Sequence, residues 1–229
     1  MARVWRALFL AASLVLGGTT AGRAVPVDLE LVLAVDCSGS VDESEFTLQI
    51  RGYASAFSHP SVIHAIRSGR YGAIAVTYVQ WSGPFLQSQV VGWTLVNDAD
   101  SAEGFGAKMA AARRSIYSGG TSLSGVIDYS ANLFGKGGYE GQRRVIDISG
   151  DGINNTGRRP SDARDDAVSR GLTINGLAIL TDFGGLDRYF EEHVAGGPGA
   201  FVIAAENFES FAAAILSKLI REIASADPG

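Results

Sequence analysis

Nearly continuous apolar runs that alternate with segments of helical periodicity constrain most strongly how this chain can fold. Residues 29–35 (LELVLAV) form such a run, as expected for a strand that is covered on both faces. Residues 42–58 then place apolar side chains at helical spacing, and the acidic residues Asp42 and Glu43 suit the start of a helix. Strands separated by helices imply right-handed crossovers, and therefore a mainly parallel sheet with helices on both faces.

The same alternation continues to the end of the chain. We expect further strands at residues 73–81, 89–95, 144–149, 172–180 and 201–204, and further helices at residues 99–117, 122–134, 160–170, 186–194 and 208–223. Only a short Gly-Pro-containing link joins the strands at 73–81 and 89–95, so these two are predicted to pair antiparallel at a sheet edge. The predicted fold class is α/β, and no linker is long enough to separate two domains.

The first 24 residues differ from the rest. Arg3 and Arg6 precede a ten-residue apolar run at 7–16, and small residues follow up to a plausible cleavage site at 22–24. This layout predicts a secretory signal peptide over residues 1–24 and a single domain over residues 25–229. The apolar run is too short to span a bilayer comfortably. We therefore expect an exported protein, periplasmic or extracellular, with no stable membrane span after cleavage.

Charge and cysteine content exclude several classes of function. The chain has 19 basic and 24 acidic residues, a net charge of −5, and loss of Arg3, Arg6 and Arg23 with the signal peptide changes this to −8. An acidic chain without a basic stretch is a poor candidate for binding nucleic acid. Cys37 is the sole cysteine, so no intramolecular disulfide can form, and its neighbours favour a small buried side chain over a nucleophile.

Polar residues gather in three loops that leave a predicted strand or enter a predicted helix, and binding sites in such sheets form at the carboxyl ends of strands. The first loop, D-C-S-G-S at residues 36–40, directly follows the first strand, and residues two apart in an extended segment point the same way. The second follows two glycines at the start of a helix, and the third directly follows the strand at 144–149. The residues expected to meet are Asp36, Ser38, Ser40, Thr121 and Asp151.

Hydroxyl and carboxylate oxygens, with no histidine or thiolate among them, suit a hard divalent cation such as Mg²⁺, or else Mn²⁺ or Ca²⁺. Zinc is disfavoured because the only nearby sulfur belongs to Cys37. The three loops contain no general base of tuned type, so no catalytic residue is assigned.

The pattern resembles the metal-ion-dependent adhesion site (MIDAS) of von Willebrand factor A-type domains, in particular a bacterial, secreted, DUF1194-like group of poorly defined function. The likeness covers the order and spacing of the three loops and the strand–helix alternation over about residues 27–225. It implies a doubly wound, mostly parallel, Rossmann-like sheet with one antiparallel edge strand. By resemblance, Ser38 and Ser40 would bind the metal directly, Thr121 directly or through water, and Asp36 and Asp151 mostly through water.

Other interpretations explain less of the pattern. Ser/Gly clusters after strands often form simple turns, and Asp36 alone is explained equally well as a cap of the next helix. A subtilisin-like triad with Ser122 as nucleophile needs a histidine base, but His59 and His64 lack a suitable context. The arginine pairs at 113–114, 143–144 and 158–159 are interpreted as solvated faces. Asp147 is left open, either as solvent-facing or as a support of the site.

The sequence therefore predicts an exported, non-enzymatic protein-binding domain of adhesion or assembly type. A bound divalent cation would bridge its hydroxyls to a Glu or Asp of a protein partner, because neutral ligands leave the cation poorly neutralised. The alternative is a metal-dependent enzyme or metal-handling factor of the cell envelope, which would use the cation as a Lewis acid.

Overall fold

The computed structural model describes residues 24–224, so the predicted signal peptide at 1–24 lies outside the described residues except for its last position. Six strands and seven helices follow one another within this range. They are β1 (Val25–Asp36), α1 (Glu43–Phe57), α2 (Pro60–Arg67), β2 (Ile74–Trp81), β3 (Gln87–Val96), α3 (Ala99–Ala111), α4 (Leu123–Ala131), β4 (Tyr139–Gly150), α5 (Pro160–Ser169), β5 (Thr173–Ile179), α6 (Leu186–His193), β6 (Val202–Ala205) and α7 (Phe211–Ala224).

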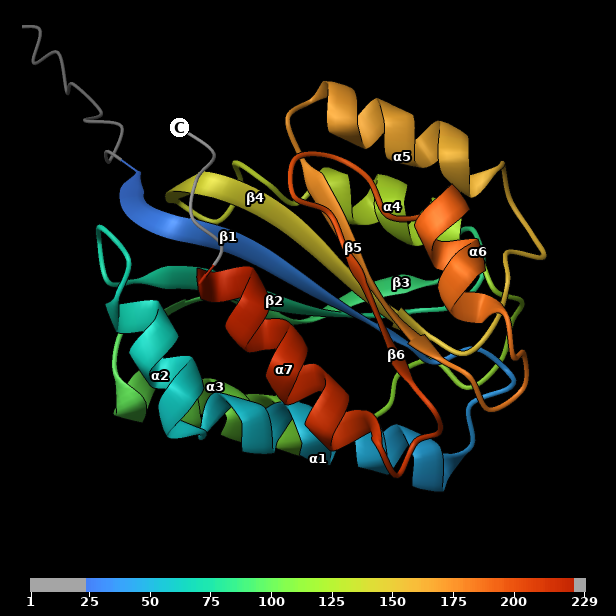
Figure 1. Cartoon of the computed structure of the whole chain (residues 1–229), viewed down its shortest axis with the longest axis horizontal. Coiled ribbons are helices and arrows are strands. Elements are labelled where there is room, and N and C mark those ends of the chain that lie inside the picture. Colours follow the sequence, from blue (N-terminus) through green and yellow to red (C-terminus); the bar gives the residue numbers. More distant parts are fainter. Residues whose placement is uncertain (1–23, 225–229) are drawn as a thin grey trace, which may run out of the picture.

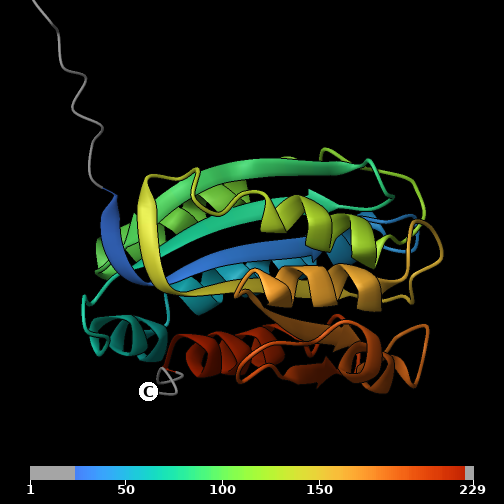
Figure 2. The same ribbon diagram turned by 90° about the horizontal axis from the view of Figure 1, so that it is seen from above.

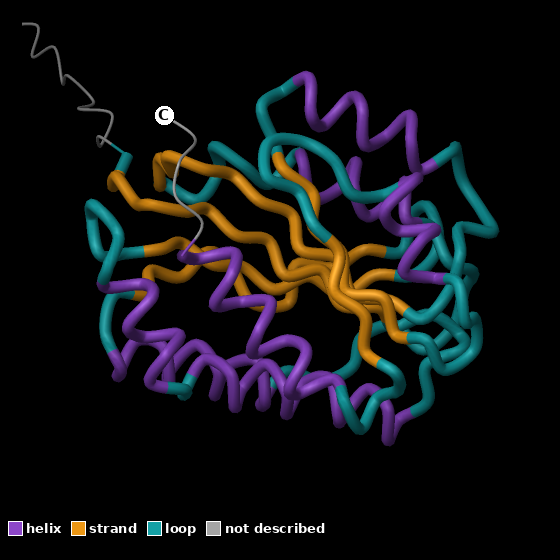
Figure 3. Tube along the Cα trace, viewed as in Figure 1, coloured by secondary structure: helices purple, strands orange, loops and turns teal. Residues whose placement is uncertain are grey.

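The sheet is the middle of three layers (Figures 1 and 3). Helices α1, α2, α3 and α7 cover one face, and α4, α5 and α6 cover the other; Figure 2 shows α4 and α5 lying along the strands. Alternate residues of β1 feed the two cores, with Leu31 and Leu33 in the larger one and Ala34 in the smaller one. No helix within residues 24–224 is long and apolar enough to cross a membrane.

The strands lie in the order β3-β2-β1-β4-β5-β6, and only β3 is antiparallel to its neighbour. This confirms the predicted mostly parallel α/β sheet with one antiparallel edge strand. The chain leaves β1 toward β2 on one side and later returns to place β4 on the other side, so the winding reverses between β1 and β4. In doubly wound sheets this switch point opens a crevice at the carboxyl ends of the strands.

The structure differs from the local predictions in several places; β4, for example, begins at Tyr139 and not at residue 144. The helix predicted at 99–117 ends at Ala111, because the chain turns to an extended conformation at Ala112 and the Arg114 side chain beyond it is drawn into the protein. Helix α2 was not predicted, although His59 accepts a hydrogen bond from the Ser61 N–H and Pro60 occupies the first helical turn. Proline at the first helical position is an ordinary signal of a helix start, whereas histidine is not among the usual N-cap residues.

Asp147 of β4 is wholly buried and lies beneath α7. Its Oδ1 lies 2.6 Å from Lys218 Nζ, which also donates to Glu222 Oε1 at 2.5 Å, and all three side chains are inaccessible to solvent. Asn175 of β5 donates to the same Glu222 oxygen at 2.9 Å. Asp147 therefore belongs to a buried polar cluster that ties α7 to the sheet, and the solvent-facing interpretation is wrong.

Candidate metal centre

The loop after β1 turns its polar atoms toward the carboxyl end of the sheet. Asp36 is wholly buried, and its Oδ1 accepts the N–H of Ser38 at 2.7 Å. The hydroxyls of Ser38 and Ser40 lie 3.1 Å apart, so the two side chains come together as predicted. The reason differs from the prediction, because β1 ends at Asp36 and residues 38–40 form a bend and a turn instead of an extended segment. Cys37 points away into the larger core, and burial raises the pKa of its thiol well above the usual range. Asp42, rather than Asp36, caps α1.

The segment before α4 brings Thr121 next to this loop. The Gly39 N–H donates to the Gly119 carbonyl oxygen at 3.3 Å, which joins the two loops directly. Thr121 itself is buried and is held by two hydrogen bonds with Asn155, one from the Thr121 N–H to Asn155 Oδ1 at 2.9 Å and one from the Asn155 N–H to the Thr121 carbonyl at 3.0 Å. Gly119 needs its φ of +119°, a conformation that favours glycine.

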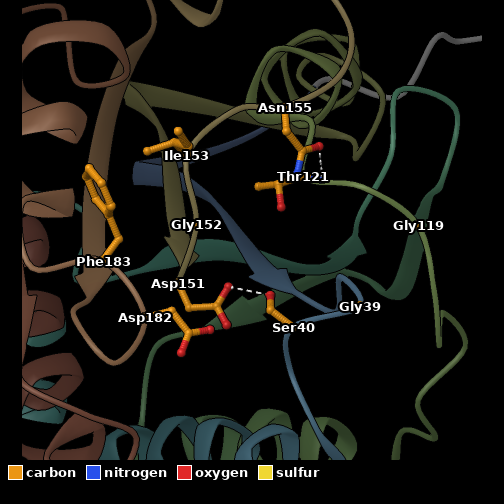
Figure 4. Close-up of a pocket in the computed structure, with 10 residues that line it drawn as sticks. All are labelled: Gly39, Ser40, Gly119, Thr121, Asp151, Gly152, Ile153, Asn155, Asp182 and Phe183. Atoms are coloured by element: carbon orange, nitrogen blue, oxygen red, sulfur yellow. Dashed lines mark hydrogen bonds between the residues drawn. The ribbon is translucent and has the colours of Figure 1, made fainter.

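Asp151 follows β4 and closes the arrangement from the other side of β1. Its Oδ1 accepts a hydrogen bond from the Ser40 hydroxyl at 2.9 Å, as the dashed line in Figure 4 shows. The side-chain oxygens of Ser38, Ser40 and Asp151 thus form a continuous chain, and Asp36 and Thr121 lie beside it. The structure brings together all five residues singled out in the sequence.

Two carboxyl groups here lie in surroundings that disfavour their negative charge. Burial, followed by the charge of Asp151, raises the pKa of Asp36 to about 7. Burial also raises the pKa of Asp151; the hydrogen bond from Ser40 opposes this rise, and the charge of Asp182 adds to it. Asp36 Oδ2 is buried and accepts no hydrogen bond from the described residues. A nearby cation would relieve both effects, so the residues present fit a metal ion.

A pocket of about 360 Å³ opens above these groups and is lined by Ser40, Thr121, Asp151, Asn155 and Asp182, among others (Figure 4). Among residues 24–224, no group of three or more histidine, cysteine, aspartate or glutamate side chains is arranged to hold a metal. The polar side chains that line this pocket are hydroxyls, carboxylates and one amide, from Ser40, Thr121, Asp151, Asp182 and Asn155. Such a ligand set suits a hard ion.

The sequence matches the family described as "Protein of unknown function (DUF1194)" over residues 26–227. The chain belongs to this family. A comparison with curated protein sequences gives no match.

Solved structures place the DUF1194 chain in the von Willebrand factor A fold. It is similar to proximal thread matrix protein 1 from the mussel byssus, whose MIDAS motif is occupied by zinc, with 16% identity over 88% of this chain and 49% of that chain and a TM-score of 0.67. It is also similar to von Willebrand factor type A from Catenulispora acidiphila, with 13% identity over 86% of this chain and 42% of that chain and a TM-score of 0.57. A third similar structure is the vWF domain of the type V pili tip protein Mfa5 from Porphyromonas gingivalis, with 11% identity over 90% of this chain and 99% of that chain and a TM-score of 0.59.

The DUF1194 chain spans about half the length of the mussel protein that it resembles. All three structures are less than 20% identical to it, so they establish the fold and not the function. They confirm the resemblance to A-type domains that the D-x-S-x-S pattern indicated.

Two polar residues of the pocket were missed in the sequence. Asp182 lies three residues beyond the end of β5 and faces Asp151 in Figure 4. The rule that found Asp151, a carboxylate just after a predicted strand, would also have found Asp182. Asn155 carried no comparable signal, because its role depends on Thr121, which lies 34 residues away.

Arg114 corrects the interpretation of the arginine pair at 113–114 as a solvated face. Arg113 is exposed, but Arg114 is buried. Its Nη2 lies 2.8 to 3.4 Å from three carbonyl oxygens of the loop at 36–41, those of Cys37, Ser38 and Val41. Its Nε donates to the Ile116 carbonyl at 2.8 Å. Arg114 therefore holds the loop at 36–41 against the segment that leads to Thr121.

Proposed function

We propose that this protein is an exported, metal-dependent protein-binding domain of adhesion or assembly type. In this proposal Ser38, Ser40 and Thr121 hold a divalent cation, with Mg²⁺ as the first candidate, while Asp36 and Asp151 balance its charge. The ion would supply one open coordination position for a carboxylate of the partner. The observation that carries the proposal is the run of oxygens from Ser38 through Ser40 to Asp151, which faces an open pocket.

Charge supports a bridge of this kind. The two buried carboxyl groups already repel each other, so a partner's carboxylate would be repelled from the pocket unless a cation lay between them. Hydroxyl ligands leave most of the positive charge of the ion uncompensated, which favours an additional acidic ligand. Mfa5 is a pili tip protein, and the mussel protein has a MIDAS motif that is occupied by zinc; both relatives are consistent with this proposal.

The test begins with the metal. Purified protein would be titrated with Mg²⁺ and with Mn²⁺ by calorimetry, alongside Ser40→Ala and the matched control Ser44→Ala. Ser44 is also exposed and hydroxyl-bearing, but its hydroxyl bonds to Asp42 at the start of α1. Loss of a residue that orients or binds a metal typically lowers its affinity by about 10–100-fold, so Ser40→Ala should bind more weakly and Ser44→Ala should not.

Partner binding is then measured in exported fractions with Mg²⁺ or with a chelator. The proposal requires proteins that are retained only with the metal and only by proteins with an intact Ser40. Equal capture in every condition contradicts it. Metal-dependent turnover of an added ester or phosphoester that is lost in Ser40→Ala would instead favour the enzyme alternative.

A further inference from the structure

Exposed apolar side chains are concentrated around the metal pocket. Seven large hydrophobic residues are exposed within residues 24–224, namely Val25, Tyr71, Phe85, Leu86, Tyr117, Ile153 and Phe183. The last five all belong to loops at the carboxyl ends of the parallel strands. We call these five residues the apolar rim. A cluster of this kind beside a polar site is typical of a surface that binds another molecule.

One part of the rim belongs to the pocket itself. Ile153 follows β4 and Phe183 follows β5, and both line the pocket. In Figure 4 they lie on the same side of it, next to Asp151 and Asp182 and away from Gly119. A ligand bound at the hydroxyls would meet both side chains on this side.

The other part of the rim lies beyond Gly119. A Cβ atom added to Gly119 would lie 3.0 Å from Leu86 Cδ1, so Leu86 lies directly against this side of the pocket. Phe85, the preceding residue in the β2–β3 loop, is 95% exposed. Tyr117, two residues before Gly119, is 66% exposed, and its ring lies 5.4 Å from the Arg114 guanidinium carbon. The pocket therefore has apolar groups on two opposite sides.

We infer that the partner presents an extended protein segment in which one Glu or Asp is flanked on both sides by aromatic or aliphatic side chains. This inference rests on the proposed function, since the central carboxylate would meet the cation. Burying exposed apolar surface is favourable at roughly 25 cal/mol per Å². Five of the seven exposed large hydrophobic side chains lie in the apolar rim, so a partner would gain most of this energy beside the pocket. Asp151 and Asp182 disfavour further acidic groups near the central one. In an extended segment, side chains two positions apart face the same way, so the flanking residues should lie at positions −2 and +2.

The probes are synthetic peptides added to the full chain and followed by NMR chemical shifts, which detect weak binding. The first carries Phe-Gly-Glu-Gly-Phe, the second replaces both Phe by Ser, and the third replaces Glu by Gln. Each is titrated with Mg²⁺ and with a chelator. Phe183→Ser and Phe85→Ser test the two sides of the rim, and Tyr71→Ser is the matched control, because Tyr71 is an exposed aromatic residue at the opposite end of the sheet.

With Mg²⁺, we expect Phe-Gly-Glu-Gly-Phe to bind at least about tenfold more tightly than the peptide with both Phe replaced by Ser. A tenfold ratio corresponds to the burial of about one aromatic side chain. Phe183→Ser and Phe85→Ser should each reduce this preference, and Tyr71→Ser should leave it unchanged. Shifts should concentrate at Gly152, Ile153 and Phe183. The Gln peptide and the chelator should abolish binding.

The outcomes separate this inference from the function on which it rests. If both Glu peptides bind equally well and only with Mg²⁺, the metal bridge stands and the apolar selectivity is wrong. If no peptide binds in a metal-dependent way, both are wrong. If the protein self-associates and Phe183→Ser abolishes this, the rim binds a second copy and the inference fails. Binding to neutral lipid vesicles that depends on Phe85 and Phe183, without peptide binding, would likewise overturn it.

Discussion

Ser40 donates its hydroxyl hydrogen to Asp151 Oδ1 at 2.9 Å across 111 residues of sequence. This bond joins the loops after β1 and β4, two neighbouring parallel strands between which the winding of the sheet reverses. It brings a neutral hydroxyl and a buried carboxylate to the edge of an open pocket.

Divalent metal should stabilise the fold. The folded chain gathers the oxygens of Ser38, Ser40 and Thr121, whereas the unfolded chain does not, so binding raises the free energy of unfolding by about 2.7 kcal/mol when Mg²⁺ is at a hundred times its Kd. Urea unfolding with Mg²⁺ and with chelator measures the difference. Thr121→Ala should shrink the metal-dependent increment, and the exposed α3 substitution Asp100→Asn should leave it intact. Identical midpoints with and without metal would contradict the proposed site.

Arg114→Lys should weaken both the fold and metal binding. A lysine cannot reproduce the contacts of the guanidinium with the carbonyls of Cys37, Ser38, Val41 and Ile116, and hydrogen bonds to a charged group are worth about 1.5–3 kcal/mol each. We expect a loss of roughly 2–3 kcal/mol in the free energy of unfolding and a lower affinity for Mg²⁺.

The exposed neighbour provides the control for that substitution. Arg113→Lys makes the same chemical change one residue away and should alter stability by less than about 0.5 kcal/mol, as is usual at the surface. Equal effects of the two substitutions, measured by urea unfolding and metal titration, would show that Arg114 does not hold the loop.

Gly119→Ala should disturb the metal site through the backbone. A Cβ atom there would lie 2.6 Å from Ser82 Oγ, and the φ of +119° is unfavourable for alanine. Since Ser82 Oγ donates to the carbonyls of Ser118 and Gly120, a shift here would move Thr121. We expect a loss of at least about 1 kcal/mol in stability, from backbone strain alone, together with weaker Mg²⁺ binding.

Gly104→Ala is the matched control for Gly119→Ala. Gly104 lies within α3, and a Cβ atom added to it meets no other atom within 4 Å. Because alanine is a better helix former, this variant should be more stable by about 0.5–1 kcal/mol and bind Mg²⁺ unchanged. Unchanged metal binding in Gly119→Ala would indicate that the Thr121 segment tolerates a displaced backbone.

The buried cluster beneath α7 should make stability depend on pH. Burial, and then the charge of Glu222, raise the pKa of Asp147 to about 8, although Lys218 opposes the rise. The folded protein therefore keeps a proton that the unfolded chain, with an ordinary carboxyl pKa near 4, has already released. The stability linked to Asp147 is fully present below about pH 4 and is lost as the pH rises toward 8, at no more than about 1.4 kcal/mol per pH unit.

Asp147→Asn removes this titration. The unmodified protein should lose stability between pH 5.5 and pH 8.5, and Asp147→Asn should lose less. Urea unfolding at both pH values measures the two changes in the free energy of unfolding. Asp100→Asn, a carboxylate lost from an exposed position in α3, should run parallel to the unmodified protein. If Asp147→Asn also runs parallel, Asp147 is ionised throughout this pH range.

Apolar periodicity in the sequence predicted both the fold and the positions of the candidate metal residues. Apolar periodicity distinguishes covered strands from helices, and it located the carboxyl ends of the strands where Asp36 and Asp151 lie. The prediction that Ser38 and Ser40 come together is confirmed, since their hydroxyls lie 3.1 Å apart, but they do so through a turn after β1 and not through alternation in an extended segment. Helix ends were less accurate, because α3 stops at Ala111 for a tertiary reason, the burial of Arg114.

The sequence by itself determined the three-layer α/β fold, because that fold depends on periodicities of two and 3.6 residues that neighbours in the chain carry. It also showed that the D-x-S-x-S loop directly follows a strand. The tertiary structure decided which charged residues are buried. Arg113 and Arg114 are identical in type and adjacent, yet only Arg114 meets the carbonyls of residues 37, 38 and 41. Likewise, Lys218 pairs with Asp147 from a helix 71 positions later in the chain. Burying a charged group is costly unless other groups compensate it, and for Arg114 and Lys218 only the folded chain brings those groups together.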